Sequence, residues 1–91
     1  MKDSQIPVLN EGFKLEKFDN EVLLYSVSDT RAVYLNDTAY LVYGICSSGR
    51  NIGEIIALLE DAYPEDKAAI RGDVILALKQ LVKNGAVVLN D

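Results

Sequence analysis

A strand that runs directly into a helix, over Ala32 to Tyr40, constrains the fold more than any other feature of this sequence. Its first half is rich in strand-forming valine, tyrosine and leucine. Asn36, or Asp37 beside it, can accept hydrogen bonds from the first free N–H groups of a helix. With Asn36 as the cap, Leu35 and Tyr40 occupy the two positions of a hydrophobic staple, which fixes the angle between strand and helix. The chain therefore changes from strands to helices at this point.

Three short strands are expected up to this junction. Phe13 to Glu16 alternates apolar and polar residues, as a half-buried strand does, and Val22 to Val27 is a denser apolar run. Arg31 to Leu35 is the third strand. Turn-forming residues separate the three segments at Asp19-Asn20 and over Ser28 to Thr30. Short strands joined by short turns predict an antiparallel meander.

Three helices are expected after the junction, the first from about Asp37 to Cys46. A second begins at Asn51, which has capping-box spacing to a glutamate, and ends at Tyr63, before a proline. The third runs from about Glu65 to Asn84, and Ala86 to Leu89 can add a short closing strand. The order β-β-β-α-α-α predicts an α+β fold with winged helix-turn-helix architecture.

The length of 91 residues fits one domain, and a hydrophobic content of 49% predicts that it folds. Residues 1–12 mix charges with a proline and a glycine and are expected to form a flexible N-terminal arm. Residues 13–91 are expected to form the single folded domain.

The composition argues against catalysis and against metal or cofactor binding. The chain has no histidine, which is the commonest general base and metal ligand. Cys46 is the single cysteine; without a histidine to activate it, we read it as a small buried hydrophobic residue. No glycine-rich phosphate loop and no cluster with metal-ligand spacing occurs. We expect no enzymatic activity and no cofactor.

A lone cysteine cannot form an internal disulfide, which fits a reducing compartment. The sequence shows no signal-peptide pattern and no run near the roughly 18 apolar residues that span a bilayer. A cytoplasmic location is therefore expected. The net charge of −5 argues against binding to anionic membranes or to nucleic acid.

A DNA-binding winged helix regulator is nevertheless the alternative function for this architecture. Lys67, Arg71, Lys79 and Lys83 are spaced by multiples of four along the last helix and are the candidate DNA-reading stripe. Acidic residues near this stripe dilute its charge. An ordinary solvated helix edge explains the stripe better than DNA binding does, and peptide binding is the next interpretation.

Peptide binding has a more specific physical case. If one flank of the third strand is open, its unpaired backbone groups can pair with a guest strand. A groove between that strand and the last helix would offer apolar pockets rimmed by cations, which favour an acidic guest. The expected floor consists of Val74, Ile75, Leu78 and Val82, and the expected rim of Arg71 and Lys79. The same open edge could pair with a second copy, so we expect a monomer or a weak homodimer.

Several short motifs occur in a fixed order along residues 13–89. They are Leu35-Asn36 with Thr38-Ala39, Gly49 followed by Ile52-Gly53-Glu54-Ile55, Tyr63, Asp73-Val74, Leu78 with Leu81, and Gly85-Ala86-Val87. Together they resemble the PqqD family, the small recognition elements that serve ribosomally made, post-translationally modified peptides.

The resemblance implies a non-catalytic winged helix-turn-helix domain that binds a precursor's leader segment as an added strand. It also implies presentation of the core segment to a modifying enzyme, often a radical SAM protein, elsewhere a leader peptidase, cyclase or dehydratase. Pyrroloquinoline quinone, lasso-peptide and sactipeptide-type pathways all fit. Carried onto this sequence, the implied peptide-binding residues are Arg31, Ala32, Val33, Tyr34, Leu35, Arg71, Val74, Ile75, Leu78, Lys79 and Val82.

Overall fold

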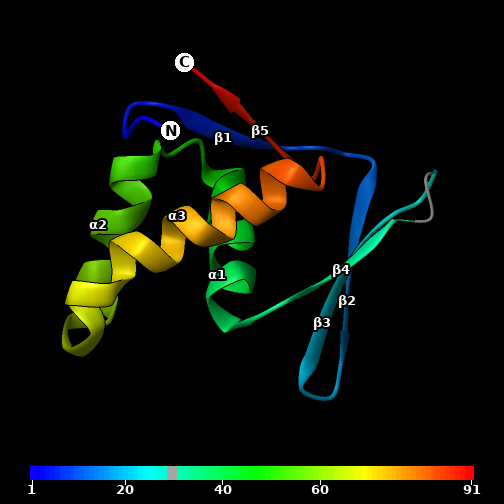
Figure 1. Cartoon of the computed structure of the whole chain (residues 1–91), viewed down its shortest axis with the longest axis horizontal. Coiled ribbons are helices and arrows are strands. Elements are labelled where there is room, and N and C mark those ends of the chain that lie inside the picture. The colour runs from blue at the N-terminus through cyan, green and yellow to red at the C-terminus, as the bar shows by residue number, and fades with distance from the viewer. Residues whose placement is uncertain (29–30) are drawn as a thin grey trace.

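The structure is a computed structural model that describes residues 1–28 and 31–91. The turn expected over Ser28 to Thr30 lies, at residues 29 and 30, outside the described residues. The remaining segments form a three-stranded sheet, three α-helices packed on it and a separate two-stranded ribbon (Figure 1). The N- and C-termini lie close together beside that ribbon.

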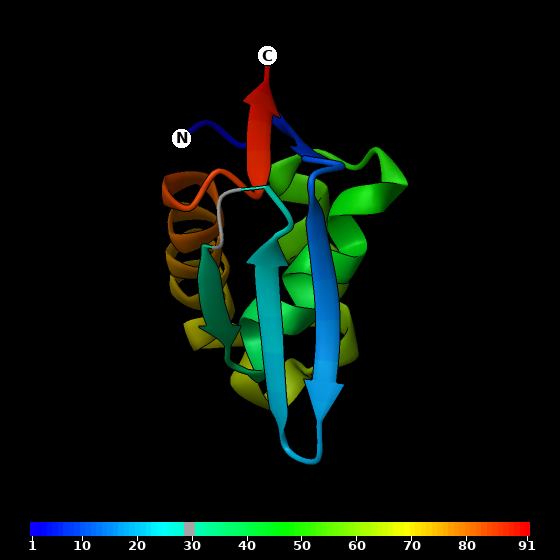
Figure 2. The same cartoon turned by 90° about the vertical axis from the view of Figure 1, so that its right-hand side faces the viewer.

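The three-stranded sheet consists of β2 (Phe13–Phe18), β3 (Glu21–Ser26) and β4 (Ala32–Leu35), antiparallel and in the spatial order β2-β3-β4. Leu35 lies opposite Val22, which fixes the register of β4 on β3. Within the described residues, helices cover one face of this sheet and leave the other uncovered (Figure 2). The predicted meander and the predicted α+β fold are confirmed.

The helical half contains α1 (Asp37–Ile45), α2 (Ile52–Ala62) and α3 (Lys67–Lys83), with short 3₁₀ turns at Cys46–Ser48 and Pro64–Asp66. The side-chain oxygen of Asn36 accepts a hydrogen bond from the Ala39 N–H at 2.8 Å, so Asn36 is the cap of α1. Asn51 and Glu54 form the predicted capping box of α2, with bonds of 2.8 and 2.9 Å. Both caps anchor helix starts that the sequence predicts.

One hydrophobic core lies between the inner face of the sheet and the three helices. Most of its fully buried residues come from β3, α1, α2 and α3, and they include Leu24, Val42, Ile52, Ile55, Val74, Leu78 and Leu81. Ala86 and Val87, which follow α3, complete this core. Cys46 is also buried in this core. No helix in the described part of the chain is long and apolar enough to cross a membrane.

The N-terminal segment differs from the flexible arm expected over residues 1–12. β1 (Ile6–Leu9) pairs with β5 (Val87–Asn90) in an antiparallel ribbon. Asn10 donates its N–H to the Ala86 carbonyl at 2.9 Å, so Asn10 and Ala86 form a hydrogen-bonded pair of the ladder. Such pairs alternate along an antiparallel ladder, so Pro7 lies at a position where the strand needs no N–H for pairing. Pro7 is fully buried. A proline that suggested a loop is therefore a buried part of a strand.

The same segment also caps α2. The carbonyl oxygens of Asp3 and Gln5 accept hydrogen bonds from the N–H groups of Gly53 and Ile52, each at 2.9 Å. The first N–H groups of a helix have no partner within the helix, so an external acceptor stabilises them. The N-terminal residues are thus held by the ribbon and by the start of α2.

Candidate functional site

The outer edge of β4 has no strand beside it among the described residues, because β4 ends the order β2-β3-β4. Ser26 donates its N–H to the Arg31 carbonyl at 2.7 Å. Since hydrogen-bonded pairs alternate along an antiparallel ladder, Val33 and Leu35 also direct their backbone groups toward β3. Ala32 and Tyr34 therefore direct theirs toward the open edge. These two residues form the pairing edge available to another strand.

An open groove of about 700 Å³ lies along α3, beside the place where β4 passes into α1. Asn36 and Thr38 line it on the junction side. The α3 side contributes Asp73, Leu76, Ala77, Lys79, Gln80, Lys83 and Asn84. Leu76 is 68% exposed although it is apolar, and it lies within this groove. The groove therefore offers an apolar contact with polar and charged groups around it.

Two hydrogen bonds fix β4 against α3. Gln80 donates from Nε2 to the Tyr34 carbonyl, and Arg31 donates from Nη1 to the Asn84 carbonyl, each at 3.4 Å. The beginning of β4 thus lies at the end of α3, and the two elements run in opposite directions. The Gln80 side chain is thus hydrogen-bonded to a β4 carbonyl that faces the open edge. A guest strand that pairs there must replace this hydrogen bond with one from its own N–H.

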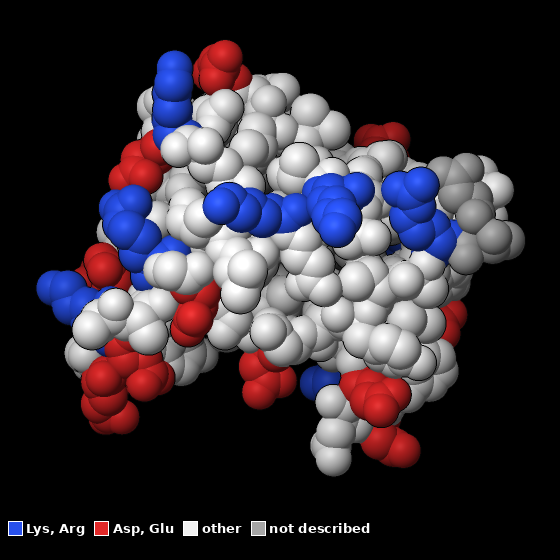
Figure 3. Space-filling view, viewed as in Figure 1, with Lys and Arg blue, Asp and Glu red and all other residues white. Residues whose placement is uncertain are grey.

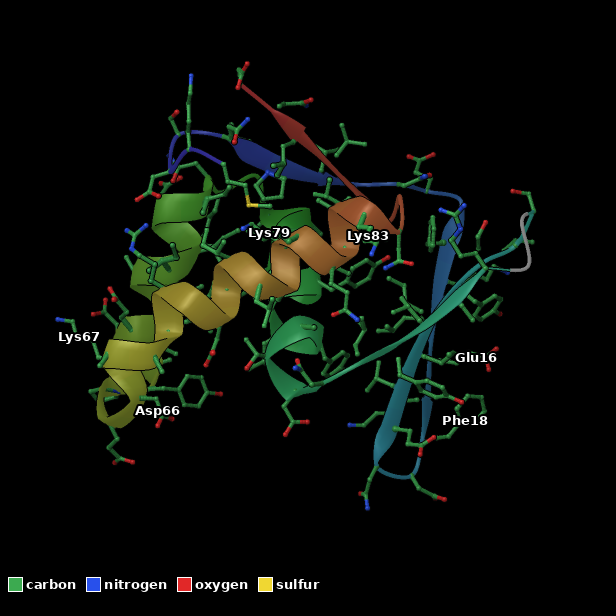
Figure 4. The ribbon with its side chains drawn as sticks, viewed as in Figure 1. Glu16, Phe18, Asp66, Lys67, Lys79 and Lys83 are labelled. Atoms are coloured by element: carbon green, nitrogen blue, oxygen red, sulfur yellow. The ribbon has the colours of Figure 1, made fainter. Side chains whose placement is uncertain are left out.

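Positive charge gathers over the C-terminal half of α3. Lys79 and Lys83 project from this half, whereas Lys67 lies at the opposite end of the helix (Figure 4). In the space-filling view, blue side chains form a row across α3 toward the sheet, with uncharged surface below them (Figure 3). Neither Lys79 nor Lys83 forms an ion pair with a described residue. Asp73 places a negative charge at the other end of the groove.

The structure brings together only part of the predicted peptide-binding set. Arg31 to Leu35 and Lys79 lie at the β4 edge and the groove. Val74 and Leu78 are fully buried, so their side chains cannot form the floor of an open groove. Arg71 binds Asp3 with contacts of 2.9 and 2.8 Å, which places it beside the N-terminal segment.

The remaining two predicted residues share the flank of Arg71. Ile75 and Val82 follow Arg71 by 4 and 11 residues and so lie on the same side of α3. Ile75 is half-buried against the core, and Val82 is 37% exposed. Of the expected floor, Val74 and Leu78 therefore lie in the core. Ile75, Val82 and the expected rim cation Arg71 lie on a flank of α3 that does not line this groove.

The flank that faces the groove was missed because the core stripe of α3 has apolar residues on both sides. Asp73, Ala77, Gln80 and Asn84 follow one another by 4, 3 and 4 residues and form this flank. Helical periodicity identifies the buried stripe but not the side on which the sheet lies. The sequence feature that could have identified the groove flank is Leu76, an apolar residue on the polar face of the predicted helix.

Catalysis by Cys46, metal binding and DNA binding are the other functions to be compared with the structure. Burial raises the pKa of the Cys46 thiol to about 11, so it stays protonated and weakly nucleophilic at neutral pH. Among the described residues, no group of three or more histidine, cysteine, aspartate or glutamate side chains could hold a metal ion. Arg71 is paired with Asp3, which interrupts the basic stripe proposed for DNA.

The family model described as coenzyme PQQ synthesis protein D (PqqD) matches residues 21–87, most of the chain. The chain belongs to the PqqD family. The resemblance inferred from the sequence motifs is thereby confirmed. Among curated protein sequences, none matches the chain.

Two solved structures share the PqqD-like fold. One is described as TbiB1 in complex with the TbiA(beta) leader peptide; it has 16% identity and a TM-score of 0.71, and the match covers 88% of this chain and 93% of that one. The other is described as lasso peptide synthetase B1 complexed with the leader peptide, with 19% identity, a TM-score of 0.74 and coverage of 91% and 98%. At these identities the likeness establishes the shared fold.

Proposed function

We propose that this protein binds the leader segment of a ribosomally synthesised precursor peptide as an added strand on β4, and presents the precursor to a modifying enzyme. The observation that carries this proposal is the open pairing edge at Ala32 and Tyr34 beside the groove along α3. Backbone pairing supplies affinity in such strand addition, and side-chain pockets supply specificity. Membership of the PqqD family and two structural neighbours described as leader-peptide complexes support the same reading.

The protein's part in this function is binding and positioning. A leader held between β4 and α3 leaves the rest of the precursor free to reach an enzyme such as a radical SAM protein, a leader peptidase or a cyclase. Tethering both on one small domain raises the effective concentration of precursor at the enzyme without any chemistry by the domain itself.

The test is an NMR titration of the ¹⁵N-labelled protein with synthetic leader peptides of candidate precursors. We expect the largest amide shifts at Ala32 to Leu35 and along Leu76 to Asn84, with slowed hydrogen exchange at the amides of Ala32 and Tyr34. Amides in β1 and β5 serve as the internal control, because that ribbon is a sheet separate from the one that contains β4. Unmoved β4 amides at saturating leader would exclude strand addition at this edge.

A further inference from the structure

The charged residues around the groove indicate which guest peptides it can bind. Of the nine basic residues in the chain, Arg31, Lys79 and Lys83 lie at or beside the groove, although the net charge is −5. Asp73 lies toward the other end of α3. The groove is therefore positive where α3 ends and negative toward its beginning. An extended guest that lies along it meets different charges at its two ends.

The side chains of a guest strand fall on two faces. Guest residues opposite Arg31, Val33 and Leu35 place their side chains on the same face as these residues, because cross-strand neighbours share a face. Leu35 is buried and Val33 packs on the core, so this is the face toward the helices. Guest residues opposite Ala32 and Tyr34 point to the uncovered face instead. Only alternate guest residues can therefore contact α3.

The spacing of the lysines matches that alternation. Lys79 and Lys83 are separated by four residues of helix, or about 6 Å of rise. Alternate residues of an extended strand are separated by nearly the same distance, about 6.8 Å. Two guest side chains at positions i and i+2 can therefore each meet one lysine. Leu76, one helical turn earlier, is placed to meet the side chain at i−2.

The direction of the guest follows from the sheet. Every strand pair in the described sheet is antiparallel, and antiparallel pairing is slightly the more stable per residue. A guest antiparallel to β4 runs in the same direction as α3, because β4 and α3 run in opposite directions. It passes Leu76 first, then Lys79, and then Lys83 with Arg31.

We propose that the groove selects a segment of the form apolar-x-acid-x-acid, read from the N- to the C-terminus and bound antiparallel to β4. This inference rests on the proposed function and adds the recognition sequence to it. The apolar side chain covers Leu76, the first acid meets Lys79, and the second meets Lys83 and Arg31. A segment with the reverse order places its acids near Asp73 and is rejected.

The test is selection of a displayed library of randomised linear peptides against the full chain. We expect enriched peptides to share the apolar-x-acid-x-acid order. With the double variant Lys79→Glu/Lys83→Glu, the first acid should be replaced by lysine or arginine in the enriched set. The preference for the second acid should weaken without reversing, because Arg31 still lies beside that position. Peptides enriched on the unmodified chain should bind this variant at least about tenfold more weakly, with a loss that shrinks at high salt.

The matched control is Lys14→Glu/Lys67→Glu, which changes the net charge equally. Lys14 lies on β2, at the far edge of the sheet, and Lys67 at the far end of α3, so selection should stay unchanged. Three results would overturn this inference and leave strand addition standing, provided that the enriched peptides shift the β4 amides. The peptides could lack acids, they could carry the acids and the apolar residue in the reverse order, or their binding could be unaffected by the charge reversal. No enrichment, together with unmoved β4 amides in the leader titration, would overturn both.

Discussion

β5 and β4 each present an edge to a further strand. Among the described residues, the chain places a strand beside β5 and none beside the outer edge of β4. β5 is paired by β1 of the same chain, whereas β4 has β3 on one side and the groove on the other. β1 is held by a backbone ladder, by the buried Pro7 and by the ion pair of Asp3 with Arg71. The filled edge thus combines the three kinds of contact that the open edge offers: backbone pairing, an apolar site and cations.

The comparison predicts its largest effect for removal of the strand that fills the β5 edge. Deleting residues 1–9 exposes the apolar groups that Pro7 and Leu9 cover and removes the two acceptors at the start of α2. We expect the free energy of unfolding in urea to fall by about 3–6 kcal/mol, or folding to be lost.

Deleting only residues 1 and 2 is the control, since it leaves the ribbon, the α2 acceptors and Asp3 in place. It should be nearly silent. If the longer deletion costs less than about 1 kcal/mol, β1 contributes little to the core and the contrast between the two edges disappears.

Proline at neighbouring positions of β4 separates the two sides of that strand. Ala32→Pro removes an outward N–H, so it should weaken leader binding by about tenfold while leaving stability nearly unchanged. Val33→Pro removes an N–H that faces β3 and should lower the unfolding free energy by about 3 kcal/mol.

Ala32→Ser keeps the outward N–H and is the matched control for binding. Calorimetric titration with the leader and urea unfolding measure the two effects on the same variants. If Ala32→Pro binds the leader as tightly as Ala32→Ser, the guest does not pair with this edge.

The contrast between the edges also shows how far sequence reasoning reaches. The strand-to-helix junction is readable because the Asn36 cap and the strand-forming residues before it act locally. β1 was missed because its evidence is distant: its partner lies about eighty residues away, and Pro7 and Gly12 signal a loop locally.

The groove was located only in part for a related reason. Local pattern identifies β4 as a strand and the buried stripe of α3 as a core face. Which flank of α3 faces β4 depends on how the whole chain is connected in space. Ile75 and Val82 on one flank, and Leu76 on the other, are equally plausible groove residues until that arrangement is known.

A smaller effect is expected at the junction that positions the open edge. Asn36→Ala removes the acceptor for the Ala39 N–H and should lower the unfolding free energy by about 1 kcal/mol. Asn36→Asp keeps an acceptor and should retain most of the stability. Thermal unfolding of the two variants measures this difference. Equal loss in both would mean that the side-chain NH₂ group of Asn36, and not its oxygen, supplies the stability of this junction.

The smallest effect is expected for the ion pair at the filled edge. Hydrogen bonding to Arg71 holds the pKa of the Asp3 carboxyl below its ordinary value of 3.8. A lowered folded-state pKa stabilises the fold above the ordinary value, and the contribution is lost as the pH falls through the folded-state pKa. Because the two side chains are 57% and 52% exposed, solvent and salt screen this pair.

Asp3→Asn keeps the backbone carbonyl that caps α2 and removes only the charge. Its melting temperature should therefore lie slightly below that of the unmodified chain at neutral pH, and the gap should close in acid, below the ordinary carboxyl pKa. Arg71→Gln should give the same profile, and the double variant should lose nothing further. A difference in melting temperature that persists in acid would show that the Asp3 side chain stabilises β1 through packing and not through its charge. The ion pair of Asp3 with Arg71 would then no longer support the expectation that cations beside β4 bind an acidic guest.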